Sequence, residues 1–192
     1  MSDEPAAMSN DPGDGRHDFD FFLGEWRIAN RKLADPLAEG PESRRWLEFE
    51  ATAKAAPILA GLGNHNTYSA PDFPGCPDFH GFALRLFDPE TGLWRIWWAS
   101  TIGRGRLDTP VVGRFRDDVG RFECDDLLGG REAKVRFDWK DITHSSARWE
   151  QSLSFDDGRT FDTNWIMEFT VGSDLTSGTR VDSCRRPEPA RP

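Results

Sequence analysis

The feature that most constrains this chain is a succession of short segments in which apolar and polar residues alternate, separated by turn residues. Alternation with a period of two is typical of β-strands with one buried face, and short connections favour antiparallel neighbours. The segments that we expect to be strands are 26–33, 45–54, 65–69, 81–88, 93–100, 111–117, 121–126, 132–142, 147–155 and 160–171. The sequence therefore predicts an all-β, up-and-down antiparallel meander of about nine or ten strands.

A meander of this size has two unpaired edges, which proteins commonly remove by closing the sheet on itself. We therefore expect a closed β-barrel spanning residues 17–171. Two segments lack the alternation and are candidate helices: a short N-terminal turn before Trp26, and residues 56–63. Residues 1–16 and 172–192 are polar and carry no strand pattern, so they are predicted to be disordered tails.

The stretch "GLWRIWWAS", residues 92–100, carries large aromatic side chains on both faces of its predicted strand. Trp94 and Trp98 share one face, and Trp97 lies on the other. Both faces then need cover. One face is expected to fill or line the barrel, and the other to be covered by residues 56–63 or by a second subunit, which leaves a homodimer open. The alternation does not say which face points inward.

Each of the last three predicted strands has one strongly apolar face and one face that carries charge. If the apolar faces point inward, the barrel interior is aromatic, as expected of a small barrel whose interior must be filled. If the charged faces point inward, Arg136, Glu150 and Glu168 form a buried cluster, which is costly unless the charges are paired. The first arrangement is the expected one, and the second stays open.

The segments "FDFFLGEWRIANRKL", "LRLFDPETGLWRIWWAS" and "VVGRFRDDVGRFECDD", together with residues 135–171, resemble the DUF1579-type family of bacterial lipocalin-like (calycin-like) domains. The resemblance spans residues 18–171 and implies a calycin barrel. In particular, Gly24 and Trp26 resemble the GxW signature of calycins, in which the tryptophan closes one end of the barrel.

The resemblance implies several functions rather than one. The calycin group includes carriers of small hydrophobic molecules, haem-binding barrels and some enzymes that work inside the barrel. Haem-binding barrels of the nitrobindin type use a histidine near the end of the last strand. Residues 160–171 contain no histidine, so the resemblance does not extend to haem ligation.

Charge and composition exclude several classes of partner. The net charge of -9 argues against nucleic acid and against an anionic membrane surface. No apolar run approaches the roughly 20 residues of a membrane helix, and the N-terminus has no secretory signal, so we expect a cytoplasmic protein. The cysteines, Cys76, Cys124 and Cys184, are odd in number and widely spaced, which predicts neither disulfides nor a zinc site.

No metal or cofactor is predicted. The four histidines lack the spacing of a pre-formed metal site, and no glycine-rich phosphate-binding motif occurs. The candidate catalytic residues are His80, Glu150 and Glu168. His80 flanks the Pro-containing loop 71–78, which we expect to fold over one end of the barrel.

The candidate ligand-binding residues combine aromatic side chains with a few polar groups, as in most small-molecule pockets. They are Trp94, Trp97, Trp98, Arg136, Trp149, Gln151, Asn164 and Trp165. By simple alternation Gln151 and Asn164 fall on opposite faces, unless a β-bulge or a shifted register brings them together.

Three functions follow from this reading. The leading hypothesis is a barrel that binds a small apolar or aromatic molecule. The alternative is a cofactor-independent enzyme, of isomerase, cyclase or hydratase type, that uses the cavity as its active site. The third is a protein-interaction module with a filled barrel, which would expose a large apolar patch.

Overall fold

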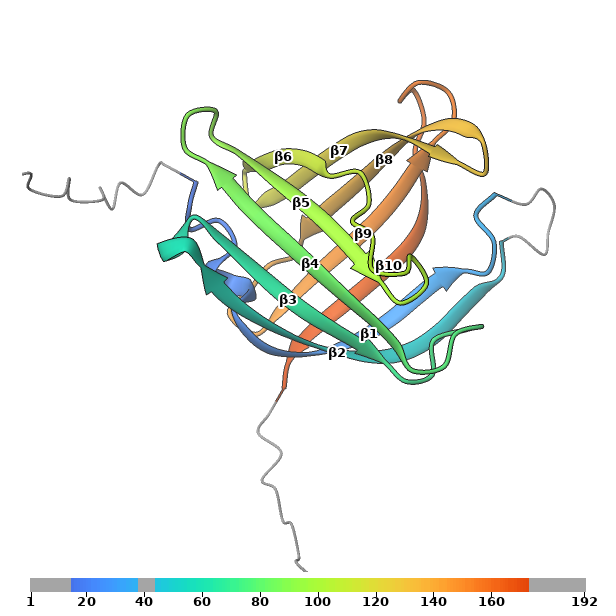
Figure 1. The fold of residues 1–192 in the computed structure, drawn as a ribbon, viewed down its shortest axis with the longest axis horizontal. Helices are drawn as coiled ribbons and strands as arrows, with labels where there is room; N and C mark the ends of the chain where they lie inside the picture. Colours follow the sequence, from blue (N-terminus) through green and yellow to red (C-terminus); the bar gives the residue numbers. More distant parts are fainter. Residues whose placement is uncertain (1–14, 38–43, 173–192) are drawn as a thin grey trace, which may run out of the picture.

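The structure is a computed structural model that describes residues 15–37 and 44–172. Ten strands follow one another round a closed barrel, and each pairs antiparallel with its neighbours in the chain (Figure 1). The strands are β1 (Gly24–Leu33), β2 (Trp46–Ile58), β3 (Gly63–Ala70), β4 (Phe79–Asp88), β5 (Leu93–Ser100), β6 (Val111–Arg116), β7 (Val119–Leu128), β8 (Arg131–Lys140), β9 (Ser146–Ser154) and β10 (Asp162–Val171).

The predicted fold is confirmed in both its class and its topology. β1 pairs with β2 on one side and with β10 on the other, so the meander closes and leaves no free edge. The 3-10 helices are η1 (Asp20–Phe22) and η3 (Leu59–Gly61). The predicted tails, 1–16 and 172–192, lie almost wholly outside the described residues, and no described helix is long and apolar enough to cross a membrane.

The N-terminal turn closes one end of the barrel. Phe19, Phe22 and Trp26 are at most 2% exposed, and Phe22 stacks on Trp26 with ring centroids 5.8 Å apart. The Trp26 indole Nε1 donates a hydrogen bond of 2.7 Å to the Phe22 carbonyl oxygen. Gly24 joins the turn to β1 with φ +113°, a backbone conformation that residues with a side chain rarely adopt. Trp26 therefore packs at the closed end of the barrel, as the resemblance to calycins implies.

The apolar faces of the last three strands point into the barrel, as expected. Trp139, Trp149 and Met167 are buried, whereas Glu150 and Glu168 lie on the opposite faces of β9 and β10, where both accept hydrogen bonds from Arg148. The interior is therefore aromatic and aliphatic, and the buried charge cluster that was the open alternative does not form.

Residues 56–63 do not form the expected helix. The first of them extend β2, with Ile58 paired to Gly63 of β3, and η3 fills the turn between the two strands. Leu59 and Ala60 both have φ of 52°, which reverses the chain, whereas an α-helix needs consecutive residues at negative φ. The prediction was wrong because this short apolar run is a hairpin.

Candidate functional site

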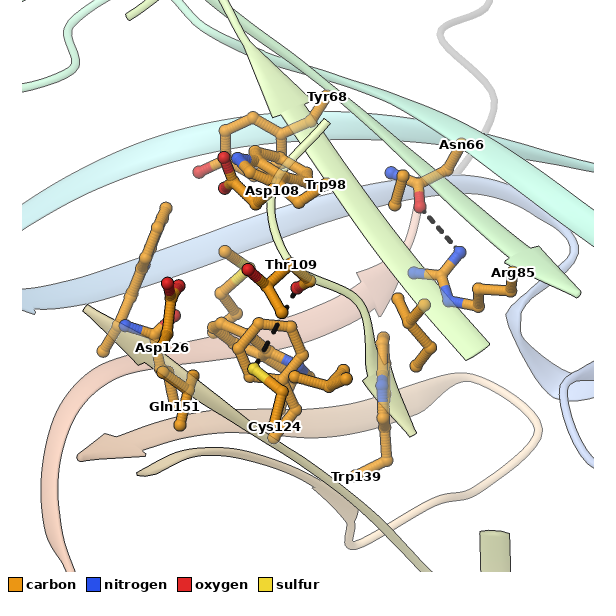
Figure 2. A pocket seen from close by; sticks show the side chains of 18 of the residues that line it. Asn66, Tyr68, Arg85, Trp98, Asp108, Thr109, Cys124, Asp126, Trp139 and Gln151 are labelled. Carbon is orange, nitrogen blue, oxygen red and sulfur yellow. Dashed lines mark hydrogen bonds between the residues drawn. The ribbon is translucent and has the colours of Figure 1, made fainter. Parts of the chain in front are cut away.

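The barrel encloses a cavity of about 260 Å³. Four tryptophans line it, each from a different strand: Trp98 from β5, Trp139 from β8, Trp149 from β9 and Trp165 from β10. The cavity wall also contains a small set of polar side chains, and Figure 2 shows several of them. An apolar wall with a few placed polar groups is the usual composition of a small-molecule site.

The tryptophan-rich strand β5 divides its aromatic side chains between three environments. Trp94 is 1% exposed and packs edge-on against Phe19 in the closed end, with centroids 5.0 Å apart. Trp98 shares the inward face and lines the cavity. Trp97 lies on the outer face, half-buried. The inward face of β5 therefore both fills the core and lines the cavity.

Gly81 leaves room for the Trp98 side chain. A Cβ atom built on Gly81 would lie 2.2 Å from the Trp98 ring, much closer than non-bonded carbon atoms approach one another. Gly81 faces inward on β4, beside β5, and the two residues are near neighbours across this strand pair. The missing side chain thus lets the indole lie against β4.

Asn30 on β1 joins two walls of the cavity. Its Oδ1 accepts hydrogen bonds from the Tyr68 hydroxyl at 2.8 Å and from the Trp165 indole Nε1 at 3.1 Å. Its Nδ2 donates to the Ile28 carbonyl oxygen at 3.2 Å. Burial raises the pKa of Tyr68, which keeps the hydroxyl protonated and able to donate. The asparagine therefore fixes the rotamers of two aromatic side chains that line the cavity.

A β-bulge brings Gln151 and Asn164 together. The register between β10 and β9 shifts between Thr163 and Trp165, so Asn164 has no paired residue on β9. The Gln151 Nε2 donates to the Asn164 Oδ1 at 3.3 Å. The alternation allowed these two residues to meet only through a β-bulge or a shifted register, and the structure has such a shift between Thr163 and Trp165. Gln151 lines the cavity, whereas Asn164 is buried and does not line it.

The most unusual side chain in the cavity wall is Arg85 of β4, which is 4% exposed. Its Nη1 donates to Asn64 Oδ1 at 3.0 Å and to Asn66 Oδ1 at 2.8 Å. The guanidinium carbon lies 4.8 Å from the ring centroid of Phe22 and 5.7 Å from that of Trp139. Burial lowers the pKa of Arg85 to about 9, so the side chain remains charged at neutral pH.

The barrel wall loosens between β5 and β6. These strands pair only through residues 94–96 and 111–113, so the last part of β5 has no partner on β6. The connecting loop 101–110 takes its place, and the Asp108 backbone N–H donates to the Trp98 carbonyl oxygen at 2.8 Å. Asp108 and Thr109 are exposed and also line the cavity, so the cavity reaches the surface here.

This rim of the cavity is acidic. Asp108 and Asp126 both line it, and partial desolvation together with the Asp126 carboxylate raises the pKa of Asp108. Cys124 lies beside them, with its Sγ 4.0 Å from the Thr109 carbonyl oxygen. Burial and the neighbouring carboxylates raise the pKa of the Cys124 thiol to about 11, so it is a poor nucleophile at neutral pH.

Loop 71–78 contributes an aromatic side chain to the other end of the barrel from η1. Phe73 is 8% exposed and stacks on Phe79 with centroids 4.2 Å apart. It also contacts Phe49 and Trp165 edge-on, at 5.0 and 6.1 Å. The loop therefore folds inward over part of this end, as expected.

The structure brings half of the predicted ligand-binding residues into the cavity wall. The four that line it are Trp98, Trp149, Gln151 and Trp165. The four that do not are Trp94, Trp97, Arg136 and Asn164. Arg136 faces outward because it alternates with the inward-facing residues of β8, and its Nε donates to Glu123 at 2.7 Å.

None of the three candidate catalytic residues faces the cavity. His80 is exposed beside the start of loop 101–110. Glu150 forms ion pairs of 2.8 Å with Lys140 and 2.7 Å with Arg148, and Glu168 pairs with Arg148 at 3.0 Å. All three alternate with buried neighbours and therefore lie on the outer surface.

Sequence reasoning missed the polar groups of β1, β3 and β4. On β4 the inward face carries Gly81, Ala83 and Arg85, whereas the outward face carries Phe82 and Leu84. In this middle part of β4 the larger apolar side chains thus lie on the outer side, although Phe79 and Phe87 near its ends face inward. A signal did exist: a strand beside a tryptophan-rich one needs small inward residues to make room for the indole rings.

Among residues 15–37 and 44–172, no group of three or more histidine, cysteine, aspartate or glutamate side chains could hold a metal ion. No protein-family model matches the chain, and no curated protein matches it. Membership of the DUF1579-type family therefore stays a prediction.

The chain is similar in fold to several solved structures, including the following two. The S-type phycobiliprotein lyase CPES from Guillardia theta is 10% identical with a TM-score of 0.51, and the match covers 87% of this chain and 99% of that one. Rv2717c from M. tuberculosis is 14% identical with a TM-score of 0.51, covering 80% and 94%. At these identities the similarity shows the fold alone, and it supports the predicted lipocalin-like barrel.

Proposed function

We propose that this barrel binds a small molecule with an aromatic or apolar body. The observation that carries the proposal is the cavity of about 260 Å³, walled by four tryptophans and open beside Asp108. A barrel that serves only as an interaction module needs no such space, because side chains fill the interior of a small barrel. The aromatic wall supplies the ligand with apolar and stacking contacts.

Binding is favoured over catalysis by the positions of the acid–base candidates. Enzymes place titratable groups with shifted pKa values inside their clefts, whereas the carboxyl group with a raised pKa in this cavity wall, that of Asp108, is exposed. Here His80, Glu150 and Glu168 lie on the outer surface, and the carboxyl groups that line the cavity, Asp108 and Asp126, belong to its rim. The similarity to the phycobiliprotein lyase is a likeness of fold and is compatible with a ligand held in the barrel.

The test uses N-phenylnaphthylamine, a neutral dye whose emission shifts to the blue in an apolar environment. The wild-type protein should give a saturable blue shift. Ala83→Phe should weaken this binding by about tenfold or more, because Ala83 lines the cavity and the new ring would occupy it.

Ala99→Phe is the matched control, since Ala99 lies on the outer face of the neighbouring strand and pairs with Phe82. It should bind the dye like the wild type. If the folded wild type gives no saturable signal, or if both variants bind equally well, the proposed function is wrong.

A further inference from the structure

Arg85 is a buried cation with no anionic partner among the residues that the structure describes. It forms no ion pair with a described carboxylate, and its two hydrogen bonds both run from Nη1 to neutral amide oxygens, those of Asn64 and Asn66. Its Nε is buried and has no hydrogen-bond partner in the described part of the chain. An unpaired buried charge is costly, and proteins usually compensate it with an opposite charge.

The aromatic rings around Arg85 compensate only part of this cost. The guanidinium lies within 4.8 to 5.7 Å of the centroids of Phe22, Phe19 and Trp139, which is cation–π distance. These contacts and the two asparagines hold the guanidinium in place, and they come from the well-packed closed end. They do not use the donor at Nε. The Arg85 side chain is thus held in place while its Nε donor has no hydrogen-bond partner in the described part of the chain.

The unsatisfied donor belongs to a residue of the cavity wall. Arg85, Asn66 and Trp139 all line the cavity, and Figure 2 shows Arg85 and Asn66 on one side of it, with Asp126 and Gln151 on the other. The cavity therefore has a cationic inner side and an acidic rim, with tryptophans between them. A ligand that matches this arrangement carries an anionic group at one end of an aromatic or apolar body.

We infer that Arg85 binds the carboxylate, or an equivalent anionic group, of the ligand that the proposed function places in the cavity. The inference rests on that proposed function and adds the chemical class of the ligand: an aromatic or apolar organic acid. A carboxylate accepts hydrogen bonds from guanidinium nitrogens in a geometry that an ammonium group cannot reproduce. Asn66 is close enough to Nη1 to keep the fork oriented while the anion binds.

Two other cations alternate with the inward-facing residues of their strands in the described part of the chain, Lys32 on β1 and Arg131 on β8, and Arg131 is exposed and lies outside the cavity wall. Lys32, near the end of β1, has its Nζ 4.8 Å from the ring centroid of Trp165, and burial lowers the pKa of its ammonium group while Asp35 opposes that shift. Lys32 is not part of the cavity wall. It has a nearby carboxylate and is therefore the weaker candidate for an anionic ligand.

The test compares two probes of nearly equal shape, naphthaleneacetate and its neutral amide, naphthaleneacetamide, by isothermal titration calorimetry. The wild type should bind the acid about tenfold more tightly than the amide, because a charged acceptor forms the stronger hydrogen bond. Arg85→Met should abolish this preference while leaving the amide affinity within about threefold of wild type.

Two controls make the result specific. Lys32→Met should keep the preference for the acid. Arg121→Met removes the same charge from the outer face, where Arg121 pairs with Asp138 at 2.8 Å, and it should keep the preference as well. Circular dichroism confirms that each variant is folded, and Arg85→Lys serves as a second probe of the site: it keeps the charge but should lose most of the preference.

The outcomes separate the inference from the proposed function. If the wild type binds acid and amide equally, the cavity binds ligands but the inference is overturned. Protein groups or water then stabilise the Arg85 guanidinium, and a ligand anion does not. The inference is also overturned if Lys32→Met, and not Arg85→Met, removes the preference. If neither probe binds and N-phenylnaphthylamine does not bind either, the proposed function is wrong, and the inference that rests on it is wrong as well.

Discussion

At the scale of single residues, the cavity depends on polar side chains that hold aromatic ones. Asn30 satisfies the hydroxyl of Tyr68, the chain's single tyrosine, and the indole of Trp165 through one oxygen atom. Arg85 is held in a similar way by Asn64 and Asn66. Buried hydrogen bonds of this kind specify one arrangement of large side chains, and losing one leaves its partners unsatisfied.

Replacing Asn30 should therefore destabilise the barrel. Asn30→Leu keeps the approximate size of the side chain but leaves the donors of Tyr68 and Trp165 without an acceptor. We expect the free energy of unfolding to fall by about 2 to 4 kcal/mol, measured by urea denaturation. Tyr68→Phe removes one of the two donors and should cost less.

The double variant should cost less than the sum of the two single changes, because they share one hydrogen bond. Strict additivity, or a loss from Asn30→Leu that is too small to measure, would show that this network does not hold the wall.

At the scale of elements, the strands differ in whether the apolar face of the sequence pattern points into the barrel. In β8, β9 and β10 the apolar face is the inner face, so alternation places their cavity residues correctly. In the middle of β4 the pattern is inverted, with Phe82 outside and Arg85 inside, whereas Phe79 and Phe87 near its ends face inward. Alternation alone does not say that Phe82 and Leu84 lie outside, and the space that Trp98 of the adjacent strand takes up beside Gly81 explains it. Residues such as Arg85 are found only when the neighbouring strand is known.

The connection between β9 and β10 depends on a single carboxylate. Asp156 accepts hydrogen bonds from the backbone N–H of Thr160 at 2.9 Å, from its hydroxyl at 2.7 Å and from the Ser154 hydroxyl at 2.7 Å. These bonds, led by the backbone N–H of Thr160, lower the pKa of Asp156 to about 2. The connection leads directly into the bulge that joins Asn164 to Gln151.

This shifted pKa gives the hairpin a defined dependence on pH. The pKa in the folded state lies below that of the unfolded chain, so the stabilisation is present above the unfolded value and is lost as the carboxylate is protonated. Asp156→Asn should lower the melting temperature at neutral pH. The difference from wild type should shrink as the pH falls from about 4 to about 2. A difference in melting temperature that stays constant over this range would contradict the role of the ionised carboxylate.

At the scale of the whole molecule, closing the meander creates the cavity, and the N-terminal turn with Phe19, Phe22 and Trp26 closes one end of the barrel. The class of fold, the number of strands and the closing role of Trp26 could all be predicted, because they depend on local pattern and on the need to remove sheet edges. Which residues face the cavity could be predicted only in part. That property depends on the bulge at Asn164 and on the packing of Trp98 against Gly81, which arise from contacts between strands.

The acidic character of the chain also takes on a specific meaning at this scale. The net charge of -9 is expected to disfavour polyanionic partners outside the barrel, yet the inner side of the cavity carries Arg85, which has no anionic partner among residues 15–37 and 44–172. We therefore expect this acidic protein to bind an anionic group only inside the barrel, where the buried guanidinium of Arg85 offers an opposite charge. Asp108 and Asp126 at the rim then favour ligands whose outer end is neutral or cationic.

The central claim, that a small aromatic molecule binds inside the barrel, is tested most directly by the indole N–H signals of the eight tryptophans in nuclear magnetic resonance spectra. Titration with naphthaleneacetamide, which does not depend on Arg85, should shift the signals of the cavity tryptophans: Trp98, Trp139, Trp149 and Trp165. The signals of Trp46 and Trp97, on the outside of the barrel, should stay in place. Shifts confined to Trp46 and Trp97 would mean that the probe binds the outer surface, and would contradict the account.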